Sequence, residues 1–108
     1  MTINGVNLEI DIFDAEKAGA YERAQKSISK LHELMTSDLS LEEKIKKACA
    51  TICKEIDNLF GKGTSTKLVD NKNNLRDVSA VWKDITINVT QQLEAESKSV
   101  FCDSSEKE

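Results

Sequence analysis

The 108-residue sequence has no proline and few aromatic residues, which make up 5% of the chain. Hydrophobic residues account for 39% and charged residues for 31% of it. This balance suits amphipathic helices that pack through aliphatic side chains, and it disfavours an all-β sandwich. A chain of this length is expected to form one domain with a core of limited size.

Long hydrophobic runs and targeting signals are also absent from the sequence. No stretch approaches the roughly 18 apolar residues that a membrane-spanning helix needs. No charged segment followed by an apolar one resembles a signal peptide at the N-terminus. We therefore expect a cytoplasmic protein that makes no contact with a membrane.

The three cysteines and the single histidine do not form a pattern typical of a metal site. Cys49 and Cys53 are four residues apart on one predicted helix, which is a poor arrangement for a disulfide, and we interpret them as small buried hydrophobic residues. Cys102 lies in a polar tail. The spacing of these residues and His32 matches no structural zinc pattern. The sequence predicts neither a metal nor a cofactor.

Positive charge is not in excess, because the formal net charge is −4 and the sequence pI is about 5.1. Proteins that coat nucleic acid need surplus Lys and Arg to displace counterions, so nucleic acid is disfavoured as a partner. Lys44, Lys46 and Lys47 form a small basic group. Glu42 and Glu43 lie beside it in the sequence, and we interpret the group as a solvated helix face.

The first residues change hydrophobic period, and the change predicts a junction between strand and helix. Apolar and polar residues alternate up to position 12, which is the period of a half-buried ribbon. Asn4-Gly5 is a hairpin signal because a type I′ turn needs positive φ at both central residues. We predict a β-hairpin over about residues 2–12. Its apolar positions are Ile3, Val6, Leu8, Ile10 and Ile12.

Two helices are predicted after the hairpin, because apolar residues recur at steps of three and four. Asp14 is the expected N-cap of the first helix, which covers about residues 14–36. Ser40, with Glu43 three residues later, forms a capping box that starts the second helix. Gly61 is the expected residue after the end of the second helix, since glycine adopts the left-handed conformation without strain.

The same spacing predicts a third helix over about residues 74–96. Residues 84–90 also alternate like a strand and are rich in β-branched side chains. We predict a helix there because the residues on both sides have a helical period, with no Gly or Pro between them. From residue 97 the chain is polar and is expected to be a flexible, disordered tail. The expected buried stripes of the three helices include Met35, Leu41 and Leu93.

Residues 61–66 place Gly, Lys and hydroxyl residues before another helical segment, as a phosphate-binding loop does. The order is different, however, because Lys62 precedes Gly63 and a helix, not a buried strand, comes before them. We interpret the segment as a turn that ends a helix. Thr64 is the expected N-cap of a short helical turn that follows.

No set of residues suited to catalysis can be assembled from the sequence. Catalysis needs a nucleophile with a base, or paired carboxylates in a cleft. His32 is interpreted as a surface or boundary residue. Trp82 and Tyr21 could stack on a ligand, but both fall on apolar stripes, which favours packing in the core. We predict that the protein is not an enzyme and acts by contact with other proteins.

Two segments resemble small proteins encoded in the tail modules of phages and prophages of Gram-positive bacteria. The first has Ile-Asn-Gly at residues 3–5, a hydrophobic ribbon, Phe-Asp-Ala at residues 13–15 and Tyr-Glu at residues 21–22. The second has the pattern Asp-x-hydrophobic-Phe-Gly-x-Gly-x-Ser at residues 57–65, with Asn-Asn-Leu at residues 73–75 after it. The two segments together span about residues 3–82.

Some members of this group resemble tail assembly chaperones. The resemblance implies a small helical protein that binds the tape-measure protein and keeps its long hydrophobic helices from aggregating before the tail tube polymerises. It implies no catalytic residue. The ribbon and the apolar helix faces are then the candidate contact surfaces, with the candidate residues Ile3, Val6, Leu8, Ile10, Phe60 and Trp82.

The sequence therefore predicts a mainly α protein, a three-helix bundle over residues 1–96 with a short N-terminal β-hairpin and a disordered tail over residues 97–108. Because three helical stripes follow the hairpin, residues 3–12 are expected to be dispensable for the core and available for contact. The expected partner is the tape-measure protein or another tail protein, and a homo-oligomer stays open because a hairpin edge can pair with a second chain. The alternative function is a small regulatory protein that binds a host protein.

Overall fold

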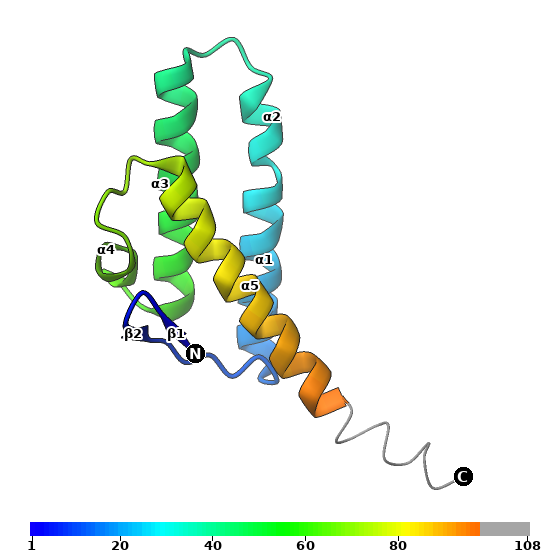
Figure 1. Cartoon of the computed structure of the whole chain (residues 1–108). Coiled ribbons are helices and arrows are strands. Elements are labelled where there is room, and N and C mark those ends of the chain that lie inside the picture. The colour runs from blue at the N-terminus through cyan, green and yellow to red at the C-terminus, as the bar shows by residue number, and fades with distance from the viewer. Residues whose placement is uncertain (98–108) are drawn as a thin grey trace, which may run out of the picture.

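The computed structural model describes residues 1–97 and has a mainly helical fold (Figure 1). The predicted three-helix bundle with an N-terminal hairpin is confirmed, and the tail predicted to be disordered lies almost entirely outside the described residues. The elements in chain order are β1 (Thr2–Ile3), β2 (Val6–Asn7), α1 (Ala15–Ser29), α2 (Leu31–Met35), α3 (Leu41–Phe60), α4 (Thr64–Leu68) and α5 (Leu75–Ser97).

The hairpin turn forms at Asn4-Gly5, as predicted. Asn4 has φ of 50° and Gly5 has φ of 81°, so both central residues have the positive φ that the hairpin turn needs. The strand pairs are Thr2–Asn7 and Ile3–Val6, and Met1 and Leu8 extend the pairing by exchanging backbone hydrogen bonds at 2.7 and 2.9 Å. The predicted hairpin over residues 2–12 is therefore too long by about four residues.

Residues 9–12 keep the alternation although they pair with no strand. Leu8, Ile10 and Ile12 are buried, while Glu9 and Asp11 between them are exposed. An extended chain turns successive side chains to opposite sides whether or not it is hydrogen-bonded to a neighbour. The segment lies on the helices and contributes to their core. The prediction that residues 3–12 are dispensable for the core is therefore wrong.

The first predicted helix is divided into α1 and α2 at Lys30. The Asp14 cap is confirmed, since its carboxylate accepts a hydrogen bond from the Lys17 N–H at 3.3 Å. At the break, the Ser29 hydroxyl donates to the Lys26 carbonyl at 3.0 Å. The Glu33 N–H donates to the Lys30 carbonyl, three residues back instead of four. This tighter turn separates the two helices that the sequence pattern predicts as one.

The long helix α3 is the centre of the bundle, with α1 and α2 running antiparallel to it and α5 crossing over the pair (Figure 1). Ser40 caps α3 by accepting the Glu43 N–H at 3.2 Å, as predicted. The buried residues of α3 are Ala48, Cys49, Ile52, Cys53, Ile56 and Leu59.

The strand-like residues 84–90 lie within α5, so the prediction of a helix is confirmed. Asn74 caps this helix, since its side-chain oxygen accepts the N–H groups of Arg76 and Asp77 at 3.0 and 3.2 Å. Ile85 and Val89 are completely buried. Among residues 1–97, no helix combines the length and apolarity needed to cross a membrane.

Candidate interaction surface

The residues predicted to make contacts lie mostly inside the molecule. Ile3, Leu8 and Ile10 are buried in the core, and Val6 and Phe60 are half-buried against it. Trp82 is buried and stacks on Tyr21, with ring centroids 5.9 Å apart and an interplanar angle of 30°. The interpretation of this aromatic pair as core packing is confirmed. In the described fold these residues are not an exposed contact surface.

The second segment that carries the family resemblance forms a sharp corner between α3 and α4. The Asp57 carboxylate accepts the Ser65 N–H at 2.8 Å and the Ser65 hydroxyl at 3.2 Å. Gly61 and Gly63 have φ of 119° and 89°, values that only glycine adopts without strain. Ser65 is completely buried. The Asp, Gly, Gly and Ser of the pattern are therefore required by the geometry of the corner.

Thr64 is the first residue of α4, and the prediction that it is the N-cap is wrong. Gly63, in the left-handed conformation, occupies the cap position instead. The Thr64 hydroxyl donates to the Gly61 carbonyl at 2.7 Å, so it closes the turn and does not accept from the helix. The Asp57 carboxylate on α3 accepts the Ser65 N–H at the start of α4. A side chain outside α4 therefore satisfies a backbone group that an N-cap side chain usually satisfies.

The two segments that carry the resemblance meet in space. The side-chain amide of Asn4, in the hairpin turn, donates to the Leu68 carbonyl at the end of α4 at 2.7 Å. Since the corner at Asp57 fixes α4, the hairpin turn is fixed to α3 through α4. The two segments form one structural unit.

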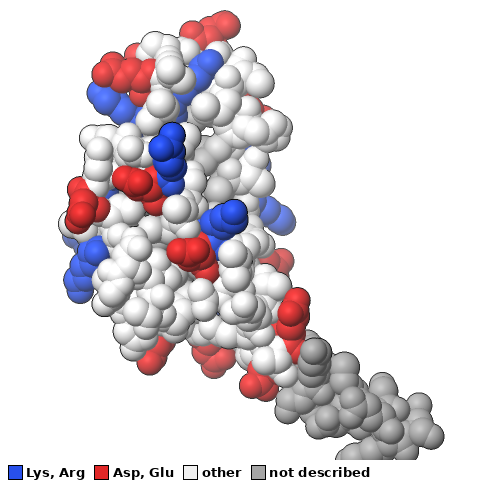
Figure 2. All heavy atoms as spheres, in the orientation of Figure 1, with Lys and Arg blue, Asp and Glu red and all other residues white. Residues whose placement is uncertain are grey.

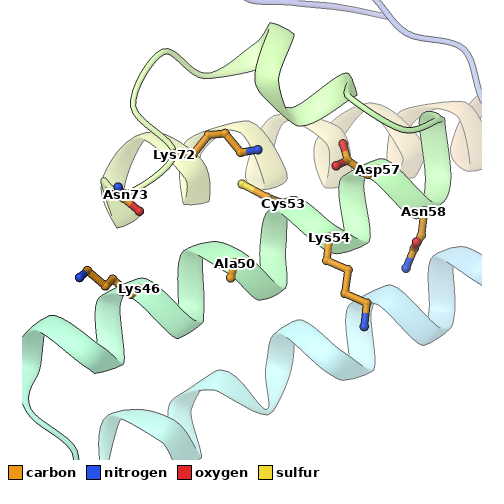
Figure 3. A pocket seen from close by; sticks show the side chains of 8 residues that line it. All are labelled: Lys46, Ala50, Cys53, Lys54, Asp57, Asn58, Lys72 and Asn73. Atoms are coloured by element: carbon orange, nitrogen blue, oxygen red, sulfur yellow. The ribbon is translucent and has the colours of Figure 1, made fainter.

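A surface cavity of about 410 Å³ lies beside this corner. Figure 3 shows that the side chains of Lys46 and Lys54 point away from Cys53, so they do not converge on a ligand position. The Lys72 ammonium donates to the Thr66 hydroxyl at 3.2 Å. The cavity is lined by Lys46, Ala50, Cys53, Lys54, Asp57, Asn58, Lys72 and Asn73.

The chemistry of this cavity does not favour a nucleophile. Burial raises the pKa of the Cys53 thiol, although the positive charge of Lys72 lowers it in part. A thiol with a raised pKa is protonated at neutral pH and reacts slowly. Within residues 1–97, no three His, Cys, Asp or Glu side chains are grouped so that they could hold a metal ion.

Large apolar side chains are exposed at both ends of the molecule. Phe13 is 54%, Ile87 is 45% and Leu93 is 39% exposed, and at the opposite end Leu41 and Met35 are exposed. The first three belong to residues 1–16 or 84–97, which we call the acidic end. The start of α1 and the last turns of α5 lie at this same end of the molecule (Figure 1).

The acidic end carries seven Asp and Glu residues and no Lys or Arg. Residues 17–83, in contrast, carry thirteen Lys and Arg residues and nine Asp and Glu residues. Figure 2 shows this difference in charge. The charged side chains along the lower edge of the visible face are acidic, whereas acidic and basic side chains are mixed above it. The acidic residues are Glu9, Asp11, Asp14, Glu16, Asp84, Glu94 and Glu96.

The last part of α5 has no cover from the other elements of the described chain. No side chain from Thr90 to Glu96 is buried. The prediction that Leu93 belongs to a buried stripe is wrong for this reason, since the stripe continues past the end of the elements that pack against it. Met35 and Leu41, at the opposite end of the bundle, were also predicted to be buried and are exposed.

Sequence reasoning missed Phe13 as a surface residue. The Asp14 N–H donates to the Asp11 carbonyl at 3.1 Å, so Ile12 and Phe13 lie in a turn before α1. In this turn Ile12 is buried and Phe13 is exposed. For Leu93 the sequence gives no signal of exposure, because its spacing is that of the buried stripe.

A family model described as a family of unknown function (DUF6673) matches residues 4–105. The chain belongs to this family. The match contains Asn4 of the hairpin turn, the whole corner between α3 and α4, and the last turns of α5. Searches of curated proteins and of solved structures gave no match.

Proposed function

We propose that this member of the family is a phage or prophage protein that acts in tail assembly, in the cytoplasm of the bacterial host. It performs no catalysis and binds the tape-measure protein, so that the long hydrophobic helices of that protein do not aggregate before the tail tube forms. The proposal starts from the resemblance of residues 3–22 and 57–75 to tail-module proteins.

The single structural observation that supports the proposal is the exposure of large apolar side chains at the acidic end. Phe13 and Leu93 are accessible there, and Leu93 lies on the last turns of α5, where no side chain from Thr90 to Glu96 is buried. Exposed apolar side chains bordered by charge are typical of surfaces that contact another protein. The carboxylates keep such a surface hydrated while it is free.

A chaperone for hydrophobic helices needs a stable body and an accessible apolar surface, and the two lie in different parts of this chain. The body consists of α1, α3 and α5 with the hairpin turn fixed to α4. The accessible surface lies where α1 begins and α5 projects. Binding at such a surface requires no change in the core.

The test is co-expression of the full chain with the tape-measure protein encoded in the same genome. We expect the two proteins to purify as a complex, and we expect more of the tape-measure protein in the soluble fraction than when it is expressed alone. The major tail protein of the same genome is the control for unspecific capture. A chain that binds no tail component and leaves the tape-measure protein insoluble contradicts the proposal.

A further inference from the structure

The inward face of α5 continues past the elements that cover it. Ile85, Val89 and Leu93 follow one another at steps of four, so they share one face of the helix. Ile85 and Val89 have no exposed surface, whereas Leu93 is 39% exposed. The last turns of α5 therefore present an apolar side chain that has the spacing of a packed helix and is only partly covered.

Phe13 adds a second large apolar side chain at the same end of the molecule. It immediately precedes Asp14, the cap of α1, and 54% of its surface is exposed. Ile87 is also exposed but lies on a different side of α5 from Leu93, because six residues separate the two positions. Phe13 and Leu93 are the apolar positions on which we base the argument.

The charge of the acidic end decides what kind of partner fits. Two copies that met through Phe13 and Leu93 would bring together the exposed carboxylates that lie within three positions of these residues in the sequence, which are Asp11, Asp14, Glu16, Glu94 and Glu96. At physiological salt the screening length is about 8 Å, so carboxylates in a shared contact repel one another with little screening. A symmetric pairing of two copies through this end is therefore disfavoured, and the occupant has to supply positive charge.

The fold itself gains little from the acidic residues near the end of α5. Glu94 and Glu96 are exposed, and neither takes part in the ion pair within residues 1–97, which joins Lys46 and Glu42. The nearest basic residue that follows, Lys98, lies outside the described residues. In contrast, Asp14 and Glu16 stabilise the start of α1. Positive charge supplied by a partner would interact favourably with Glu94 and Glu96.

We propose that the acidic end docks an amphipathic helix of the partner protein, with Lys or Arg residues beside its apolar face. Phe13 and Leu93 contact the apolar face, and Glu94 and Glu96 lie opposite the basic residues. Recognition of a helix by an apolar contact with charged borders is an established mode of binding. The inference deepens and rests on the proposed function, in which the partner helix belongs to the tape-measure protein, and it specifies the place and the chemistry of the contact.

The probe for the test is a synthetic Leu/Lys peptide about five helical turns long, with Leu at helical spacing along one face. A Leu/Glu peptide with the same Leu positions is the comparison. We expect the full chain to bind the Leu/Lys peptide and not the Leu/Glu peptide. Spectral changes in a titration followed by NMR should centre on Phe13 and Leu93.

The apolar part of the contact is tested with the double variant Phe13→Ser/Leu93→Ser. We expect it to weaken binding of the Leu/Lys peptide by about tenfold or more, since apolar contacts at the centre of an interface contribute most of its affinity. Met35→Ser/Leu41→Ser is the matched control, because it removes two exposed apolar side chains from the opposite end. Thermal unfolding of both variants shows whether the fold is kept.

The charged part is tested with Glu94→Gln/Glu96→Gln, with Glu42→Gln/Glu43→Gln as the exposed control pair on α3. We expect the first pair to weaken binding about threefold to tenfold and to reduce the effect of raising the salt concentration, whereas the control pair changes neither. Equal binding of the two peptides, or equal losses in test and control variants, would overturn the inference. A dimer of the wild type that Leu93→Ser dissolves would also overturn it, because the occupant is then a second copy.

The same variants separate this inference from the proposed function. A tape-measure complex that forms in wild type and persists in Phe13→Ser/Leu93→Ser leaves the function standing and overturns the docking site. A chain that binds the Leu/Lys peptide at Leu93 but no tail protein supports the docking site and contradicts the tape-measure role.

Discussion

The corner between α3 and α4 and the acidic end differ in how they use polar side chains. At the corner, Asp57 and Asn4 make hydrogen bonds inside the protein, to Ser65 and to Leu68. At the acidic end, Glu94 and Glu96 are exposed on the last turns of α5, where no side chain from Thr90 to Glu96 is buried. The first region holds the fold together, and the second region is available to other molecules.

This difference shows why residues that form a recognisable sequence pattern need not mark a contact site. The Asp, Gly and Ser residues of the corner are each required by backbone geometry. The exposed residues of the acidic end satisfy no such geometric requirement. The pattern at the corner therefore points to a structural unit, and the contact surface has to be found from exposure and charge.

The largest expected effect contrasts two neighbouring residues of the N-terminal segment. Ile12 is 4% exposed, and Ile12→Ala should lower the free energy of unfolding by about 3 kcal/mol because it leaves a cavity in the core. Phe13→Ala should cost less than about 1 kcal/mol because half of the side chain is already in water. Urea unfolding followed by circular dichroism measures both values, and equal losses would contradict the described burial.

The corner should come second in the size of its effect. Asp57→Ala removes the acceptor of the buried Ser65 N–H and hydroxyl, and we expect a loss of about 2 kcal/mol in the free energy of unfolding. Asp70→Ala is the control, since Asp70 is exposed. A loss at Asp57 no larger than that of the control would show that the corner does not depend on this carboxylate.

Replacing two glycines with alanine should change the stability of the fold in opposite directions. Gly5 has φ of 81° and no atom within 4 Å of an added Cβ, so Gly5→Ala should cost about 1 kcal/mol through backbone strain alone. Gly19 lies inside α1 and faces only the flexible end of Arg23. Gly19→Ala should stabilise by about 0.5–1 kcal/mol. Melting temperatures of the two variants should move in opposite directions.

The smallest effect on stability is expected at the acidic end itself. Glu94→Gln/Glu96→Gln removes two exposed carboxylates from α5, so the free energy of unfolding should change by less than about 0.5 kcal/mol. A loss of 1 kcal/mol or more in urea unfolding would show that these carboxylates have a structural role. The comparison between the corner and the acidic end would then fail.

Much of the fold could be predicted from the sequence because its signals are local. Capping by Asp14 and Ser40, the turn at Asn4-Gly5 and the helical period of residues 74–96 each depend on interactions between neighbours in the chain. The break at Lys30 could not be predicted in this way. At the break, the Ser29 hydroxyl bonds to the Lys26 carbonyl and the Glu33 N–H bonds to the Lys30 carbonyl. The apolar spacing of the sequence, in contrast, continues as one helix to residue 35.

The contact surface was predicted less well, for a physical reason. Ile3, Leu8 and Ile10 were assigned to a free ribbon, but the alternation that suggested pairing also arises when an extended chain lies on helices. Leu93 has the spacing of a buried residue, and its exposure depends on how far the neighbouring elements reach along α5. The spacing of residues in a single sequence does not show how far the neighbouring elements extend along α5.

The sequence by itself determined the helical periods, the caps at Asp14 and Ser40, the turn at Asn4-Gly5 and the acid-only composition of residues 1–16 and 84–97, because each of these depends on residue type and short-range spacing. Only the tertiary structure decided that residues 8–12 belong to the core, that Asn4 is bonded to α4, and that Phe13 and Leu93 stay exposed at one end. Burial depends on which elements meet in space, and the crossing of α5 over α1 and α3 settles that.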